Sequence, residues 1–238
     1  MRVVLQVLGS LAVALLWLPD IHPFASYQSV PKKASATVFV EAAEKVGLNF
    51  RHYNGMTGKF YLPEIMGSGA GLLDYDNDGD LDVYLAVNVF AKGDNPNTYR
   101  KVLTNGLHPN TDRLYRNDWD SIKNHPFFTN VSKQAGILQE GYTHSVTICD
   151  INLDGWKDVY VTNDYLSQNI LYINNRNGTF TNQCKNYFKH TAFNAMGADV
   201  VDLNNDGLSD VIELDMNPED NYRKKTMLGS ANYQTNGS

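Results

Sequence analysis

An acidic nine-residue pattern that occurs three times constrains this chain more than any other feature. The pattern reads D-x-[DN]-x-D-G-x-x-D, and its copies occupy residues 74–82, 150–158 and 202–210. An apolar run precedes each copy, and a run rich in β-branched residues follows it. Flanks of this kind, without a helical period, predict that each acidic segment is a bend between two β-strands.

The oxygen-bearing side chains of the pattern predict about three calcium sites. Carboxylates at this density repel one another unless a cation or protons compensate them. Oxygen ligands at alternate positions, around a glycine that permits a sharp turn, are what calcium selects. Position seven needs only its backbone carbonyl, so its side chain is free to vary. The candidate ligands are Asp74, Asp76, Asp78, Asp80, Asp82, Asp150, Asn152, Asp154, Trp156, Asp158, Asp202, Asn204, Asp206, Leu208 and Asp210.

Three other interpretations of the pattern are weaker. Ordinary acidic turns share these residue types, but turn chemistry does not require oxygen ligands at the same positions three times. An EF-hand needs a helix on each side and a glutamate at position twelve, which only the third copy has. We expect that residue, Glu213, to face solvent from a strand. A phosphatase with Asp74 as nucleophile would use a single copy inside an α/β sheet.

Two further repeated elements accompany the acidic loops. Residues 39–48 and 128–137 both run from an aromatic through a polar stretch to a glycine and an aliphatic. Residues 112–117 and 169–174 share a Leu-Tyr-x-Asn core that predicts a strand, and an Asn-Gly pair after the second copy predicts a hairpin turn. One unit therefore comprises four antiparallel, sequentially adjacent strands. Repetition of such units predicts an all-β chain, a β-propeller of four-stranded blades with calcium loops.

The first residues predict an export segment. An apolar run from Val3 to Leu18 follows Arg2 and is too short for a comfortable membrane span. We expect residues 1–26 to be a signal peptide and the protein to be secreted or to lie in the cell envelope. An uncleaved anchor, which would be the one contact with a membrane, and a buried helix stay open as alternatives.

The remaining chain divides into a linker and the repeat region. Residues 27–36 are polar and mixed, and they predict a linker. The propeller blades are expected over residues 37–238, beginning with a short strand at 37–40. A segment at 90–106, rich in Asn, Gly and Lys, predicts an exposed insertion and a candidate surface for a partner.

Composition limits the choice of partner. The 238 residues carry a formal net charge of -6 and no basic stripe, which argues against nucleic acid. Cys149 and Cys184 lack the spacing of a zinc or redox site, and both a bridge between them and two free thiols remain open. No set of nucleophile, base and acid can be assembled, so no catalytic residue is predicted and the chain is expected not to be an enzyme.

The residues that lead into the first loop resemble a known family. Residues 61–73, YLPEIMGSGAGLL, followed by the first loop, look like the FG-GAP/VCBS repeat proteins, and more narrowly like the cartilage-acidic-protein-like group that carries a C-terminal ASPIC/UnbV domain. The resemblance covers about residues 37–227. It implies a seven-bladed propeller related to the integrin α-subunit head, with calcium loops between the first two strands of a blade. It also implies an exported, non-enzymatic binding or adhesion role.

Three loops account for about three blades, whereas a closed propeller needs roughly four to eight. We therefore expect an incomplete propeller that corresponds to the N-terminal part of a longer family member. Its partner is expected to be an unknown protein or a carbohydrate. The alternative function is a hydrolase or lyase that uses the same scaffold and a loop-borne site.

Overall fold

The computed structural model describes residues 39–58, 62–89, 101–164, 167–192 and 194–216. The expected signal peptide at 1–26 and linker at 27–36 lie outside the described residues, as do positions 90–100 of the insertion. A compact unit begins at Ala42, and every helix and strand given below belongs to it. No helix within the described ranges is long and apolar enough to cross a membrane.

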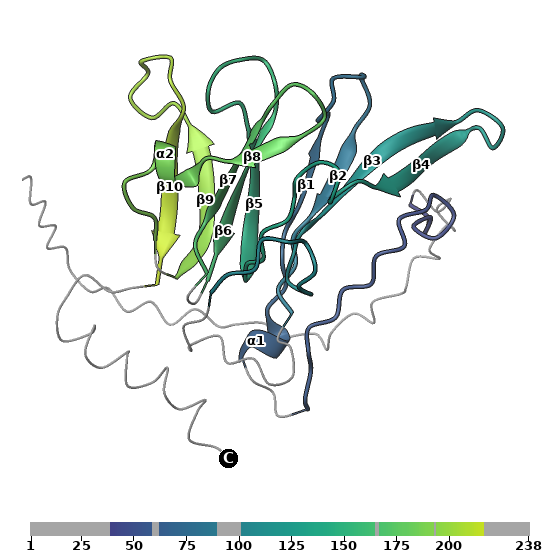
Figure 1. The fold of residues 1–238 in the computed structure, drawn as a ribbon, viewed down its shortest axis with the longest axis horizontal. Coiled ribbons are helices and arrows are strands. Elements are labelled where there is room, and N and C mark those ends of the chain that lie inside the picture. Colours follow the sequence, from purple (N-terminus) through teal and green to yellow (C-terminus); the bar gives the residue numbers. More distant parts are fainter. Residues whose placement is uncertain (1–38, 59–61, 90–100, 165–166, 193, 217–238) are drawn as a thin grey trace, which may run out of the picture. The chain divides into compact units, whose positions relative to one another are not determined.

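The strands form several antiparallel sheets, which confirms the prediction of an all-β chain (Figure 1). The first sheet contains β1 (Ala70–Leu73), β2 (Asp82–Leu85), β3 (Arg113–Asp120) and β4 (His125–Asn130). The second contains β5 (Thr143–Cys149), β6 (Asp158–Asn163), β7 (Ile170–Asn174) and β8 (Phe180–Asn182). The third contains β9 (Ala195–Val201) and β10 (Asp210–Asp215), and the short helices are α1 (Leu62–Ile65) and α2 (Cys184–Tyr187). The predicted unit of four sequentially adjacent strands is confirmed for the first two sheets.

The second sheet is covered on both faces, because successive side chains of a strand point in opposite directions. Val161 of β6 packs with Leu73 in a cluster shared with the first sheet. Its neighbour Tyr160 packs with Val211 in a cluster shared with the third sheet. Every residue of β6 is buried, as expected for a strand that has apolar neighbours on both sides.

The sheets meet through their first strands. β1 lies beside β5, and β5 lies beside β9. The Thr147 hydroxyl of β5 donates a hydrogen bond to the Ala198 carbonyl of β9 at 3.0 Å. Each acidic loop joins the first strand of its sheet to the second, so Figure 1 shows the three loops at one common edge. The prediction that the loops are bends between strands is confirmed, and the flanking helices of an EF-hand are absent around all three.

A turn that recurs in the chain precedes each of the first two sheets. The two copies of the repeated element end in the same turn, with Leu48 N–H donating to the Ala43 carbonyl and Ile137 N–H to the Ser132 carbonyl, both at 2.8 Å. Each turn then accepts a hydrogen bond from the outer strand of the sheet that follows it. The donor–acceptor pairs are Phe128 N–H with Val46 O at 2.7 Å and Phe180 N–H with Ala135 O at 2.8 Å.

A buried polar network lies at the sheet ends opposite the acidic loops. The Asp112 carboxylate accepts hydrogen bonds from the Tyr84 hydroxyl at 2.9 Å and the Val87 N–H at 2.8 Å. It also accepts one from the Thr143 hydroxyl of the second sheet at 3.2 Å. Burial outweighs these hydrogen bonds and raises the pKa of Asp112 to about 7.

The second sheet repeats this network with an amide in place of the carboxylate. Asn169 accepts the Asn163 N–H at 2.8 Å and donates to the Tyr160 hydroxyl at 3.3 Å and to the Glu213 carboxylate. Glu213 also accepts the Ala192 N–H at 2.9 Å. The expectation that Glu213 is a strand residue is right, but its side chain faces the second sheet because it has donors there.

Two further expectations are decided by the described residues. Phe39 and Val40, the described part of the strand expected at 37–40, belong to no strand and are 88% and 75% exposed. That expectation is wrong, because a strand needs backbone partners and none of the described residues pairs with these two. Cys149 and Cys184 are free thiols, which excludes the bridge.

Candidate metal centres

The aspartate at position one stabilises the turn in the same way in all three loops. Both of its carboxylate oxygens accept backbone N–H groups, one from position five and one from position six. For Asp74 these donors are Asp78 at 3.1 Å and Gly79 at 3.0 Å. The counterparts Asp150 and Asp202 accept the N–H groups of Asp154, Gly155, Asp206 and Gly207 at 2.8–3.1 Å. The loops are therefore pre-formed, with position one pointing into each turn.

Position five turns its carboxylate back toward the loop, where one oxygen accepts the N–H of position seven. The distances are 3.1 Å for Asp78 to Asp80, 2.9 Å for Asp154 to Trp156 and 2.9 Å for Asp206 to Leu208. This contact uses only the backbone of position seven. The side chains there differ accordingly: Leu208 is 58% exposed, whereas Trp156 is half-buried and lines a cleft of about 570 Å³ with Arg176.

The first loop brings three carboxylates together. Single oxygens of Asp74, Asp76 and Asp78 lie within 4.8 Å of one another, a spacing that one cation can bridge. Asp76 Oδ1 and Asp80 Oδ1 are buried and accept no hydrogen bond from the described residues. Burial, followed by the charges of neighbouring aspartates, raises the pKa of both Asp76 and Asp80. A hard cation fits this all-oxygen set, because it would supply the partner that these oxygens lack.

The second and third loops carry an asparagine at position three. Asn152 and Asn204 each donate to the carboxylate of position five, at 2.9 and 3.0 Å. In the second loop, Arg176 also pairs with Asp154 through Nε at 3.0 Å and Nη2 at 2.9 Å. Against the effect of burial, the Trp156 N–H and this guanidinium lower the pKa of Asp154. The first loop carries the most negative charge of the three, with five carboxylates against three in each of the others.

Position nine is tied to the backbone on both sides of the loop. Asp82 accepts the Tyr75 N–H at 2.9 Å and the Asn117 N–H of β3 at 2.8 Å. Asp158 does the same with Ile151 at 3.0 Å and Asn174 of β7 at 2.8 Å. Burial raises the pKa of Asp82 to about 7 and raises that of Asp158. Asp210 accepts the corresponding Leu203 N–H at 3.0 Å.

In the first two sheets, position nine therefore joins the acidic loop to the third strand. The structure brings positions one, three and five of the first loop together, and it places position nine in this backbone lock.

Asn117 and Asn174 contribute to the loops although the sequence predicted only strand residues there. Besides their N–H groups, their side-chain amides donate to the carbonyls of position eight, Leu81 at 3.2 Å and Lys157 at 3.3 Å. The signal was present, since both occupy the last place of the repeated Leu-Tyr-x-Asn core. A strand alone does not require an asparagine at that place, so its recurrence marks a specific contact.

Position four of each loop has a left-handed backbone. The φ angles are 60° at Asn77, 57° at Leu153 and 61° at Asn205. Asparagine tolerates this conformation, whereas an aliphatic side chain costs about 1–2 kcal/mol there.

We expect Leu153→Asn, measured by urea denaturation in chelator, to raise the free energy of unfolding by about 1 kcal/mol, because it relieves this strain. Leu153 is 54% exposed, so little packing is lost. The reciprocal Asn77→Leu variant should be destabilised by a similar amount. A Leu153→Asn variant that is no more stable than the wild type would contradict the strain.

The comparison with known families supports the repeat character of these loops. A family model described as an FG-GAP-like repeat matches residues 150–212. The match begins at the first aspartate of the second loop and ends in β10, so it contains the second and third loops. No curated protein matches the chain. The chain thus contains an FG-GAP-like repeat, a repeat of the β-propeller type, at this segment.

Proposed function

We propose that the chain is an exported calcium-binding β-propeller repeat module with a structural, adhesion or partner-binding role and without catalytic activity. The observation that carries this proposal is the first loop, where three carboxylates converge and two buried oxygens have no donor among the described residues. The three sheets are the blades of an incomplete propeller. The residues at 61–73 favour the cartilage-acidic-protein-like, ASPIC/UnbV-associated group, and the match at 150–212 supports the FG-GAP-like repeat alone.

In this proposal calcium has a structural role as a brace: it holds the acidic loop in one conformation. A cation at positions one, three and five neutralises the repulsion within the loop, and position nine carries the resulting rigidity to the third strand. A fixed loop keeps the first two strands of each sheet in register. Calcium modules outside cells have affinities of about 10⁻⁴ to 10⁻³ M, so an exported protein would hold the ion there.

Thermal melting of the wild type and Asp78→Asn, in chelator and in calcium, tests the brace. The variant keeps an oxygen for the Asp80 N–H and removes one charge. At about 2 mM calcium and the affinities above, each occupied site should add about 0.6–1.8 kcal/mol to the wild type. In chelator we expect Asp78→Asn to be as stable as the wild type or more stable, because it relieves repulsion. In calcium the order should reverse.

A matched control is Asp120→Asn, in the hairpin between β3 and β4. Asp120 also accepts backbone N–H groups, those of Ile122 and Lys123 at 3.0 and 2.9 Å, and it lies outside the loops. Its variant should keep the full calcium response. Identical melting of the wild type in calcium and chelator would refute the proposal, and so would an equal calcium response in Asp78→Asn.

A further inference from the structure

A pocket of about 640 Å³ lies along the outer strand of the second sheet, between β8, α2 and the chain that follows α2. Its size is within the range of small-molecule sites, roughly 300–1,000 Å³. Asn169, directly before β7, and Cys184, at the start of α2, are its buried residues. Since β7 begins at the sheet end opposite the acidic loops, the pocket is separate from the candidate metal centres.

The pocket exists because the chain departs here from its own repeat. The two earlier copies of the turn have Gly47 and Gly136 at φ 77° and 82°, which reverse the chain. Phe188 stands at the corresponding place and is extended, with φ -115° and ψ 131°. Its ring packs on Tyr160 at a centroid distance of 5.4 Å. The residues after Phe188 therefore run along the pocket and line it, a course that the repeated scaffold does not require.

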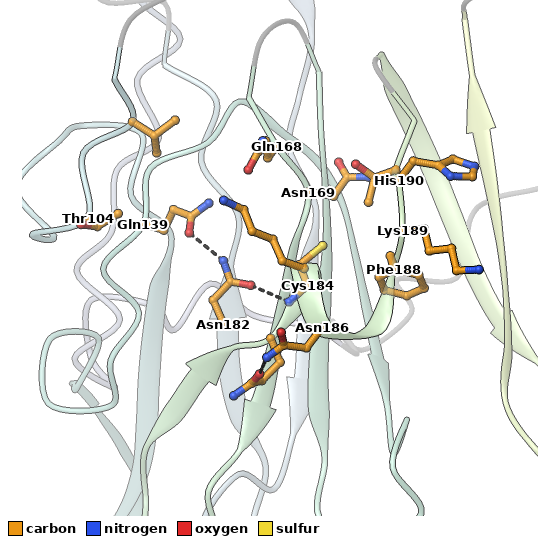
Figure 2. A pocket seen from close by; sticks show the side chains of 14 residues that line it. Thr104, Gln139, Gln168, Asn169, Asn182, Cys184, Asn186, Phe188, Lys189 and His190 are labelled. Atoms are coloured by element: carbon orange, nitrogen blue, oxygen red, sulfur yellow. Dashed lines mark hydrogen bonds between the residues drawn. The ribbon is translucent and has the colours of Figure 1, made fainter.

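The neutral lining consists mainly of amides that are held in place. Gln139 accepts a hydrogen bond from Asn182 at 2.7 Å, and Asn182 accepts the Cys184 N–H at 3.0 Å. Figure 2 shows Gln139 and Asn182 joined on one side of the pocket, with Gln168 near its upper rim. Amides offer both donors and acceptors, so this lining suits a ligand that carries many hydroxyl groups.

The ionisable side chains that line the pocket on its charged side are all basic ones. Lys185, Lys189 and His190 line the pocket, and no carboxylate does so among the described residues. Neither lysine forms an ion pair with another described residue. The chain as a whole has 26 acidic and 20 basic residues, so a lining without carboxylates is a local reversal of its charge. The nearby Glu213 carboxylate lies behind Asn169, with which it forms a hydrogen bond. An anionic ligand would be attracted here and repelled from the acidic loops.

We propose that this pocket binds an acidic oligosaccharide. The amides recognise its hydroxyl groups, the partly buried Phe188 offers an apolar surface to its C–H groups, and the lysines pair with its carboxylate or sulfate groups. Burial raises the pKa of Cys184 to about 11, so its thiol stays protonated and binding occurs without nucleophilic attack. The inference rests on the proposed partner-binding role and gives it a ligand class.

Isothermal titration of the purified chain in calcium tests the ligand class. The probes are trigalacturonic acid, a chondroitin sulfate tetrasaccharide and the neutral maltotriose. At least one acidic probe should bind, and maltotriose should bind at least about tenfold more weakly. In Lys185→Gln/Lys189→Gln, affinity for the acidic probe should fall about tenfold or more. Added salt should weaken binding to the wild type, because the lysines are exposed.

The matched control is Lys133→Gln, since Lys133 is the exposed counterpart of Lys185 in the preceding copy and lies outside the pocket. It should bind as the wild type does. Absence of binding for both acidic probes would overturn the inference, as would equal losses in the two lysine variants or equal affinity for maltotriose. Melting in calcium and chelator on the same preparation separates these results from a failure of the calcium proposal.

Discussion

Gly136→Ala is expected to lower the free energy of unfolding by about 3 kcal/mol or more, because a single methyl group there meets the backbone of a neighbouring strand. Gly136 has φ 82°, and a β-carbon there would lie 2.8 Å from the Phe180 carbonyl oxygen. That carbonyl belongs to the strand that docks on the turn through the Phe180–Ala135 hydrogen bond. The backbone must therefore shift, and the docking contact weakens with it.

Gly178→Ala provides the control for this effect. Gly178 has nearly the same φ, 77°, but a β-carbon there would meet nothing within 4 Å. Its variant should lose only the conformational contribution, about 1 kcal/mol. Urea denaturation of both variants measures the difference. Equal losses would show that the turn at Gly136 is not packed against β8.

Asp112→Asn is expected to change how stability depends on pH. The folded-state pKa of Asp112, about 7, lies above the value of about 3.9 for an unfolded aspartate. The folded chain then binds the extra proton, so the contribution of Asp112 is fully present below about pH 4 and is lost as the pH rises through about 7. Between about pH 5 and pH 8 the wild type should lose about 2–3 kcal/mol relative to the variant.

The amide should fit, because the second sheet already has one at the same place. In the variant, the side-chain oxygen would accept the Val87 N–H, and the amide would donate to the Tyr84 hydroxyl, as Asn169 does with Tyr160. Other titrating groups contribute equally to both proteins, so the difference between two urea titrations isolates Asp112. A difference that stays constant between the two pH values would contradict this prediction.

Local chemistry predicted the acidic loops well. Alternating oxygen ligands and a glycine determine a tight turn within nine residues, and the apolar flanks determine that strands surround it. The strands that contain the Leu-Tyr pair and the Asn-Gly hairpin followed from equally short patterns. These features could be predicted because the interacting residues are close in the sequence.

Contacts between distant residues could not be predicted in this way. Asp82 and Asn117 meet only after β2 and β3 pair, so the sequence pattern could not predict the backbone contacts of position nine. Glu213 faces inward because Asn169 and the Ala192 N–H lie across from it. The expected strand at 37–40 failed for a related reason, since its β-prone residues have no pairing partner among the described ones. Strand propensity expresses fit to a neighbour more than an intrinsic preference.

The repeated turn couples the stability of each unit to that of its neighbour in the sequence. The Val46 carbonyl accepts a hydrogen bond from the first sheet, and the Ala135 carbonyl accepts one from the second sheet. Each unit therefore completes the packing of the one that follows, and its stability is a nearest-neighbour property. During synthesis, each turn emerges before the strand that docks on it, so the coupling between units forms in the order of the chain. A unit at the growing end would gain its full stability only when its successor has folded.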